Sequence, residues 1–160
     1  MIKLVVDSNI VFSSLIKGKK SEVLRKIIFL SSKIKLIAPE ELLFELHKHF
    51  EKFTSEEVEE VLYILFTQIN VIPRGFYKNE ISEAYSVAKQ FDEKDTPFVA
   101  LALKLKAPIW TGDKKMIIYG LKSGKYLALD TKAVEELIKG RLLEDVLKDL
   151  EKRYLTSHNK

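Results

Sequence analysis

Carboxylates in this sequence stand at the ends of apolar segments, where a charged oxygen is expensive unless something binds it. Asp7 ends the apolar run IKLVV, and Asp113 follows the run PIWTG. Asp92 and Asp95 precede the apolar segment TPFVALAL. A carboxylate that loses its hydration needs a hydrogen-bond donor, a proton or a cation. The positions of these residues therefore predict chemistry that depends on carboxylate oxygens.

The elements that must position these acids alternate between strands and helices. Short apolar runs predict strands at residues 2–6, 35–38, 69–72, 108–111 and 126–130. Helical periodicity predicts helices at residues 21–31, 39–53, 79–91, 96–106, 115–121 and 131–138, another that begins after Thr54, and a last amphipathic helix at about 141–155. The expected start signals are Ser21, Pro39, a Thr54–Glu57 capping box and Thr131. This alternation predicts an α/β domain with a mainly parallel sheet, in which the helices of 39–68 project as an arm.

A parallel sheet would bring several of the acids to one edge. Ligands bind outside the carboxyl ends of parallel strands, where the strand order reverses. Asp7 and Asp113 follow the first and fourth strands, and Asp95 begins a helix on the same rim. Glu41 and Glu45 are four residues apart and share a helix face. These acids converge if the first and fourth strands are neighbours.

Converging carboxylates predict a site for a hard cation. The chain has no cysteine, so a thiol nucleophile, a disulfide and a zinc–thiolate site are excluded. His47 and His49 are two residues apart on a helix and diverge. Ligands that offer only oxygen favour Mg²⁺ or Mn²⁺. One or two such ions activate water and stabilise charge on a phosphodiester, which predicts metal-dependent phosphodiester hydrolysis.

Each acid also has a purely structural interpretation. Asp95 could only cap the helix that begins at Thr96, and Asp113 could cap the helix that follows it. Asp92 could be a solvated residue at a helix end, and Glu45 an ordinary surface glutamate. Asp7 is the hardest to explain in this way, because it closes a buried strand.

Four motifs in this order make the sequence resemble the PIN domain family, the fold of VapC-type toxin ribonucleases and of several RNA-processing nucleases. They are LVVDSNIVFSSL, APEELLFEL, FDEKDTPFVALAL and IWTGDKKM. The resemblance implies a three-layer α/β fold, with a five-stranded parallel sheet in the order 3-2-1-4-5 flanked by helices. It also implies a Mg²⁺- or Mn²⁺-dependent endonuclease that acts most often on RNA.

The resemblance further implies roles for individual residues. The catalytic acids would be Asp7, Glu45, Asp95 and Asp113, and the metal ligands would be Asp7, Asp95, Asp113 and, as an auxiliary, Asp92. Glu45 is preferred to Glu41 because it precedes Leu46 as in the family motif, although Glu41 could serve one turn earlier. Asn9 and Thr111 either orient the ligands or play structural roles, as a helix cap and an ordinary strand residue.

Lysines near the acidic motifs are candidates for contacts with phosphate. Lys17, Lys19 and Lys20 follow the first motif in a glycine-containing loop, and Lys114 and Lys115 follow Asp113 directly. The net charge of +4 permits nucleic-acid binding without requiring it. Solubilising surface lysines are the alternative interpretation of each group.

Aromatic residues and the last helix leave the assembly open. The phenylalanines of residues 39–68 fill the core or an interface, or form a stacking platform for bases. They are Phe44, Phe50, Phe53 and Phe66. The amphipathic helix near the C-terminus either closes the monomer or pairs with a second subunit to form a homodimer.

The whole chain sets the remaining expectations. Its 160 residues predict one domain, with a core at about 1–139 and the amphipathic helix added to it. No apolar run is long enough to span a membrane and no signal-peptide cleavage site follows the N-terminus, so a cytoplasmic location is expected. Acids and bases dominated by Glu and Lys suit a thermophile.

Other functions remain open on the sequence. A phosphatase of the haloacid dehalogenase type also begins with a strand ending in Asp, but it needs a second Asp where Asn9 stands. A PIN-like module could bind RNA or protein without cleaving. Within the nuclease interpretation, a toxin would have an antitoxin protein as its partner, whereas a housekeeping RNA-processing or single-strand nuclease would not.

Overall fold

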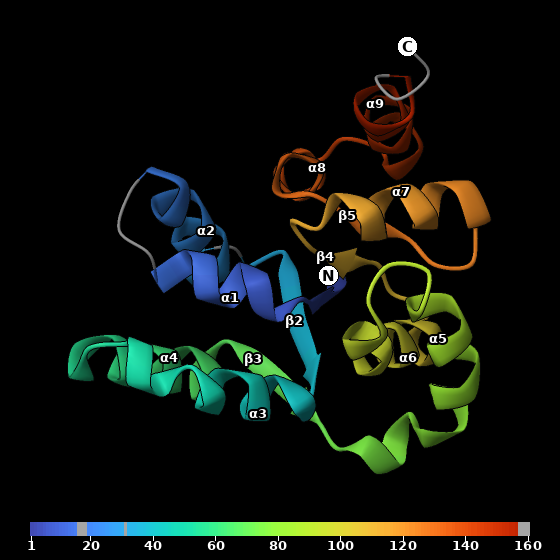
Figure 1. Ribbon diagram of the computed structural model, residues 1–160. Helices are drawn as coiled ribbons and strands as arrows, with labels where there is room; N and C mark the ends of the chain where they lie inside the picture. Colours follow the sequence, from blue (N-terminus) through green and yellow to red (C-terminus); the bar gives the residue numbers. More distant parts are fainter. Residues whose placement is uncertain (16–18, 31, 157–160) are drawn as a thin grey trace.

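The computed structural model describes residues 1–15, 19–30 and 32–156, apart from the side chains of Leu15, Lys19, Lys20, Ser21, Phe29, Leu30, Val61, Leu65 and Phe66. Its centre is a five-stranded parallel sheet in the order β3-β2-β1-β4-β5 (Figure 1). The strands are β1 (Ile2–Val6), β2 (Ile34–Pro39), β3 (Ile69–Ile72), β4 (Ile109–Trp110) and β5 (Ala128–Leu129). The sheet and its order match the expected PIN-like α/β fold.

The α-helices α1 to α7 connect these strands, and α8 and α9 follow the last strand. They are α1 (Ser8–Leu15), α2 (Lys19–Leu30), α3 (Glu41–Lys48), α4 (Ser55–Thr67), α5 (Ile81–Ala88), α6 (Thr96–Leu105), α7 (Lys114–Ser123), α8 (Thr131–Ile138) and α9 (Leu143–Tyr154). Four single turns of 3₁₀ helix, η1 (Phe50–Lys52), η2 (Arg74–Phe76), η3 (Lys78–Glu80) and η4 (Glu93–Asp95), join some of them.

The strand order reverses after β3, and this reversal divides the helices between the two faces of the sheet. The chain moves outward from β1 to β3 and then returns past β1 to β4 and β5. Because parallel crossovers are right-handed, helices before and after the reversal cover opposite faces. Figure 1 shows α1 to α4 on the left of the central strands and α5 to α7 on the right. The carboxyl ends of β1 and β4 meet at this reversal.

The structure confirms some of the helix start signals predicted from the sequence and contradicts others. The capping box at Thr54 and Glu57 is confirmed, since both reciprocal hydrogen bonds are present. Ser21 was wrong as a cap because α2 already begins at Lys19, and Pro39 was wrong because it is the last residue of β2. The cap of α8 is Asp130, which accepts from the Ala133 amide at 2.9 Å, and not Thr131.

The segment directly after β1 is a helix that was not predicted from the sequence, and Asn9 lies inside this helix and does not cap it. Helix α1 starts directly at Ser8, and the Ile10 amide donates to the Asp7 carbonyl oxygen at 3.0 Å. Lys19 and Lys20 begin α2 and do not lie in a loop, and their side chains lie outside the described part of the chain, as does all of Lys17. Polar Ser and Asn residues in SNIVFSSL obscured the helical periodicity.

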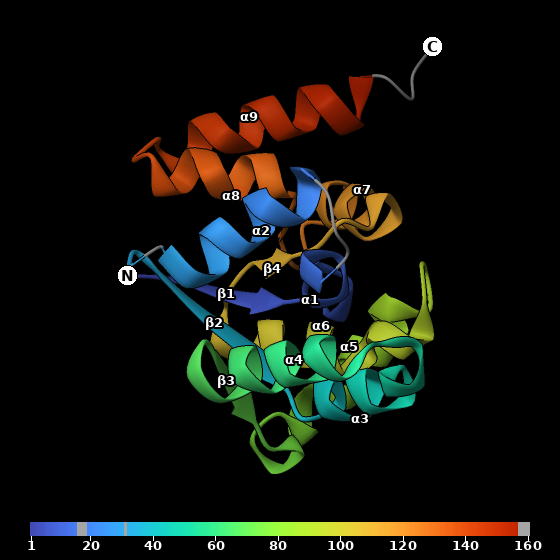
Figure 2. The same cartoon turned by 90° about the vertical axis from the view of Figure 1, so that its left-hand side faces the viewer.

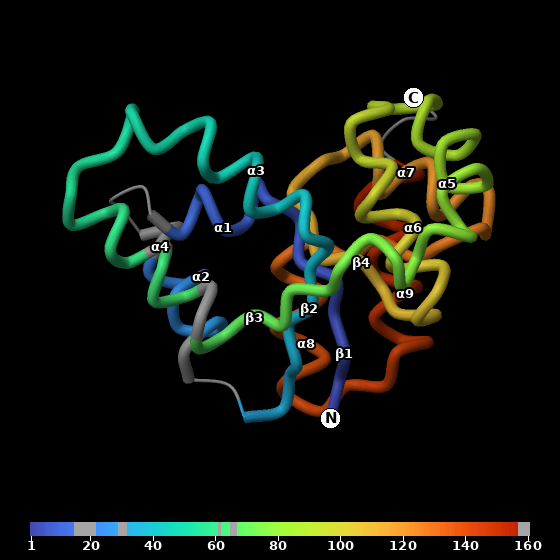
Figure 3. The backbone as a smooth tube through the Cα atoms, turned by 90° about the horizontal axis from the view of Figure 1, so that it is seen from below, coloured from blue at the N-terminus to red at the C-terminus, as the bar shows by residue number. Residues whose placement is uncertain are grey.

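The helices of 39–68 extend away from the sheet together with α1 and α2, as seen from below in Figure 3. Phe12 of α1 packs edge-on against His49, with ring centroids 4.9 Å apart, and lies 6.1 Å from the ring of Phe53. Arg25 of α2 forms a salt bridge of 2.8 Å with Glu60 of α4. The expected arm is therefore a four-helix lobe.

The core lies on both faces of the sheet. It contains the fully buried side chains of Leu4, Val5 and Val6 from β1, and of Phe98 and Leu101 from α6. Helices α8 and α9 run side by side along the top of Figure 2, and α9 buries Val146 and Leu150 in the same core. Among the described residues, no helix has both the length and the apolar character that crossing a bilayer requires.

Candidate functional site

Asp7 and Thr111 lie side by side at the reversal of strand order. Val6 pairs in register with Trp110, so β1 and β4 end at the same level. The Asp7 amide donates to the Trp110 carbonyl oxygen at 2.9 Å, and the Thr111 hydroxyl donates to Asp7 Oδ2 at 2.7 Å. Two residues that are 104 positions apart are thereby joined by a buried hydrogen bond.

Asp7 is buried, since only 1 % of its surface is exposed. Burial raises the pKa of its carboxyl group, because the charged form loses water, while hydrogen bonds from Thr111, the Asn9 backbone and Ser8 act in the opposite direction. The Ser8 hydroxyl lies 3.4 Å from Oδ1. The Asp113 carboxylate adds a repulsion that raises the pKa further. Asn9 thus supports Asp7 through its backbone, and its side chain is exposed.

Asp113 and Asp92 each use one oxygen as a helix cap. Asp113 Oδ1 accepts from the Lys115 amide at 2.9 Å at the start of α7, and the Asp113 amide donates to Thr111 Oγ1 at 3.0 Å. Asp92 Oδ1 accepts from the Lys94 amide at 3.0 Å at the start of η4. The capping role considered for Asp113 is therefore real, but it leaves Oδ2 of both residues without a hydrogen bond within the described part of the chain.

Asp95 stands at the cap position of α6 but does not cap it. Its side chain makes no cap hydrogen bond, and no other described group donates to it. The pKa of Asp95 is raised to about 8, first because its carboxyl group is largely buried and then because Asp7, Asp92, Asp113 and Glu45 repel its negative charge. The negative charges of the other four acids therefore all act on the Asp95 carboxyl group.

One stripe of α3 faces the same place. The residues Glu41, Phe44, Glu45, Lys48 and His49 follow each other at helical spacing, and all of them line one pocket. Leu42 and Leu46 lie on the other side of the helix and are fully buried. The helix is thus fixed by its leucines and presents polar and aromatic groups to the pocket.

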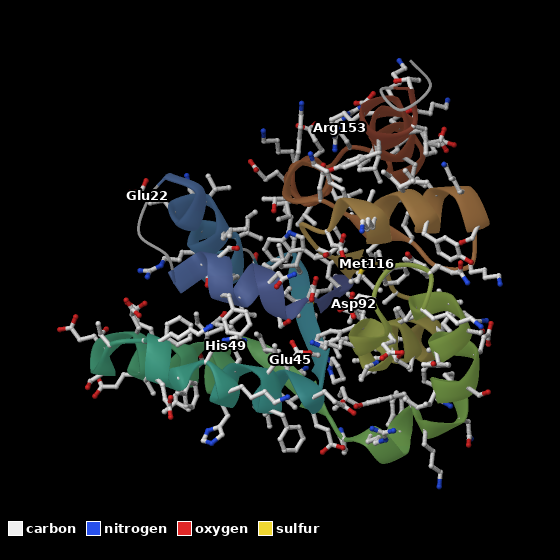
Figure 4. All side chains as sticks on the ribbon, viewed as in Figure 1. Glu22, Glu45, His49, Asp92, Met116 and Arg153 are labelled. Carbon is white, nitrogen blue, oxygen red and sulfur yellow. The ribbon has the colours of Figure 1, made fainter. Side chains whose placement is uncertain are left out.

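The two glutamates of this stripe have different surroundings. Glu41 accepts a short hydrogen bond from the buried Tyr77 hydroxyl and pairs with Arg74 at 3.1 Å. Burial raises the pKa of Glu45, with Ser8 lowering it through a hydrogen bond and Asp7 and Asp92 raising it by repulsion. Figure 4 shows Glu45 and Asp92 on opposite sides of the space between α3 and the segment before α6.

These groups surround a cavity of about 460 Å³. Its lining includes Glu45, Asp92, Asp95 and Asp113, with Ser8 between them and the buried Asp7. A larger cavity of about 630 Å³ lies elsewhere, between α6, α7 and α9, and is mainly apolar. The smaller cavity is the better candidate for chemistry, because it is lined by Asp95 and Glu45, whose pKa values are raised by burial and by neighbouring carboxylates.

The donor chemistry of this pocket suits a hard cation. Among the described residues, the five acids Asp7, Glu45, Asp92, Asp95 and Asp113 form no salt bridge, whereas other acids such as Asp130 and Glu60 do. No three His, Asp or Glu side chains in the described ranges are arranged so that they could hold a metal ion as they stand. The carboxylates fit a divalent ion by charge and by ligand type, but coordination by three of them would require their side chains to turn toward the ion.

Basic groups near the pocket only partly match the expected ones. Lys114 and Lys115 are exposed in the first turn of α7 and do not line the cavity. Lys48 and Lys94 do line it, and the sequence analysis missed both. Helical spacing from Glu45 could have identified Lys48, since a residue three positions later lies on the same face.

Fold and site together define an α/β protein with an acidic pocket at the carboxyl ends of its central strands. A family model described as the PIN domain matches residues 5–151. The chain therefore belongs to the PIN domain family, which is a family of nucleases. This membership decides against the phosphatase alternative.

Solved structures agree on the fold. A chain in the crystal structure of VapBC2 from Rickettsia felis bound to a DNA fragment from their promoter superposes with a TM-score of 0.61. The match covers 81 % of this chain and 98 % of that chain at 15 % sequence identity. No curated protein matches the sequence.

The buried hydrogen bond of Thr111 yields a first prediction. Thr111→Val keeps the shape of the side chain but leaves Asp7 Oδ2 without its donor, so we expect the free energy of unfolding to fall by about 1–3 kcal/mol. Urea denaturation at neutral pH measures the change. Thr111→Ser retains the hydroxyl and should lose clearly less; equal losses in the two variants would show that the hydroxyl is not what matters.

The raised pKa of Asp95, caused by burial and by the repulsion of nearby acids, yields a second prediction, for protein in EDTA. The folded-state pKa of about 8 lies above the ordinary pKa of 3.8 for an aspartate, so the native state binds more protons between these values and its stability falls as pH rises through them. Asp95→Asn removes this loss. Near pH 8, we expect the melting temperature of Asp95→Asn to exceed that of the wild type by about 2–4 °C for each kcal/mol gained in the free energy of unfolding. Near pH 5, the increase should be smaller.

The matched control for this prediction is Glu59→Gln, which removes an exposed acid of α4. It should change the melting temperature little at either pH. A gain for Asp95→Asn that does not grow with pH would contradict the raised pKa of Asp95.

Proposed function

We propose that this PIN domain is a Mg²⁺- or Mn²⁺-dependent endoribonuclease that hydrolyses phosphodiester bonds of RNA in the acidic pocket. The observation that carries the proposal is that Glu45, Asp92, Asp95 and Asp113 line one pocket and the buried Asp7 lies next to it, and that none of these five carboxylates forms a salt bridge among the described residues. Such a set either holds protons or binds a cation. Family membership favours the cation, since phosphodiester hydrolysis at neutral pH benefits from one.

Residues of the pocket divide into holding and proton-transfer roles. Asp7, Asp95 and Asp113 would hold the ion, with Asp92 at its edge, and the ion would supply charge stabilisation and a more acidic bound water. Thr111 and Ser8 keep the Asp7 carboxylate in place through their hydroxyls. Glu45, with a raised pKa and no salt bridge among the described groups, is suited to accept a proton from the attacking water.

Lysine side chains at the rim of the pocket support the proposal that the substrate is a polyanion. Lys48 and Lys94 line the pocket and Lys114 and Lys115 stand just outside it. A lysine at the N-terminus of a helix opposes the helix dipole, so local helix stability does not explain the pair in α7. Contacts with phosphate groups of the strand offer a reason for their position.

A role as the toxin of a toxin–antitoxin pair, in the cytoplasm, is the more specific form of the proposal. It is supported by the fold shared with a chain of the VapBC2 structure and by nothing in the pocket itself. An RNA-processing nuclease would have the same pocket and no antitoxin. Expression of the chain alone separates the two, because a toxin arrests growth and an inactive Asp95→Asn variant relieves the arrest.

Cleavage tests the proposal through the two glutamates of α3. Wild-type protein with Mn²⁺ should cut a labelled single-stranded RNA, and EDTA should stop the reaction. Glu45→Gln should lower the rate by about 10²-fold or more, the scale of general acid–base catalysis. Glu41→Gln should keep the rate and lower stability instead, because Glu41 pairs with Tyr77 and Arg74.

The opposite pattern would contradict these roles. If Glu41→Gln abolished cleavage and Glu45→Gln did not, the assignment on α3 would be reversed. Binding of several RNAs by the wild type without Mn²⁺-dependent cleavage would favour the non-catalytic module.

A further inference from the structure

Phe44 occupies an unusual place in the fold. It lies on the pocket-facing stripe of α3 next to Glu45, and 62 % of its surface is exposed. Other aromatic side chains, such as Phe98, Trp110 and Tyr77, are fully buried. Phe44 is not among the hydrophobic residues that pack against the core. Its ring therefore contributes little to folding and stays available at the mouth of the acidic pocket.

Other aromatic rings of this region pack against one another. Phe12 lines the same pocket and packs edge-on against His49, and it also lies beside Phe53. His47 packs against Phe50 with ring centroids 5.4 Å apart. Among the described side chains, none forms a ring contact with Phe44. Within the described part of the chain, Phe44 is thus an aromatic group of the pocket whose ring packs against no other ring.

Two lysines line the same pocket as Phe44. Lys48 follows Phe44 by four residues, which places it one turn along the same face of α3. Lys94 lines the pocket from the segment that carries Asp92 and Asp95. Neither lysine forms a salt bridge among the described residues. An aromatic face together with lysines is the combination that binds single-stranded nucleic acid, in which bases stack and phosphates pair with lysine.

We propose that Phe44 stacks on a nucleobase of the substrate strand while Lys48 contacts the backbone beside it. Stacking would fix the position of the strand relative to Glu45, the neighbouring residue, and so select the phosphodiester that enters the pocket. Because a paired base offers no free face, the contact also favours a single strand over a duplex. The inference rests on the proposed function for the identity of the substrate.

Binding of a short single-stranded oligoribonucleotide tests the stacking contact. The measurement uses fluorescence anisotropy with the Asp95→Asn protein, which keeps the pocket and does not depend on cleavage. We expect a further Phe44→Ala change to raise Kd by about 5- to 100-fold, the effect of losing one stacked base. Phe44→Trp should keep the affinity, because it retains an aromatic face. Phe76→Ala removes another exposed phenylalanine, outside the pocket, and should change Kd little.

An abasic scan makes the test specific for a base. Each nucleotide of the RNA is replaced in turn by an abasic nucleotide. The Kd of each RNA is then measured for the protein with Phe44 and for the Phe44→Ala protein. At one nucleotide, the loss of affinity from the abasic replacement and the loss from Phe44→Ala should not add. Each of the two changes removes the same stacking contact. Additive losses at every nucleotide, or a Phe44→Ala protein that binds as tightly as its parent, would overturn the proposal.

Failure of this proposal is distinguishable from failure of the proposed function. If the wild type does not cleave but the abasic scan shows coupling to Phe44, the stacking contact stands and the nuclease does not. If cleavage occurs but no nucleotide couples to Phe44, the nuclease stands and the stacking contact does not. No RNA binding at all would overturn the stacking contact.

Discussion

A buried hydrogen bond between Thr111 and Asp7 is the contact on which the acidic pocket depends. It joins the ends of β1 and β4 at the point where the strand order reverses, and so fixes a carboxylate beneath the cavity. The field of this carboxylate reaches both Asp95 and Glu45. Because Thr111 Oγ1 also accepts from the Asp113 amide, one hydroxyl sets the positions of two acids.

Much of this arrangement could be predicted from the sequence, because buried parallel strands are continuous apolar runs. IKLVV and INVI coincide with β1 and β3, and the acids that follow β1 and β4 lie at the same edge. The capping box at Thr54 was predictable because both of its partners are close in sequence. The strand order came from the resemblance to the family, since periodicity does not determine which strands are neighbours.

What the sequence could not provide depends on contacts between distant residues. Glu41 and Glu45 share a helix face, and only the position of Tyr77 and Arg74 shows that Glu41 is engaged elsewhere. Phe44 resembles a core residue in the sequence, whereas the buried leucines of α3 turn it toward the pocket. The cap of α8 was misplaced by one residue because Asp130, which also binds Arg153 and Tyr154, ends its strand earlier than expected.

The central proposal is that these carboxylates bind a divalent cation. Anomalous diffraction from crystals soaked in Mn²⁺ tests it most directly, because the scattering identifies the ion and its ligands together. The account predicts a Mn²⁺ peak in the pocket in contact with Asp7 and Asp95, and its absence from crystals of the Asp95→Asn protein. Saturating Mn²⁺ with no peak at these carboxylates, or with the ion bound only elsewhere, would contradict the account.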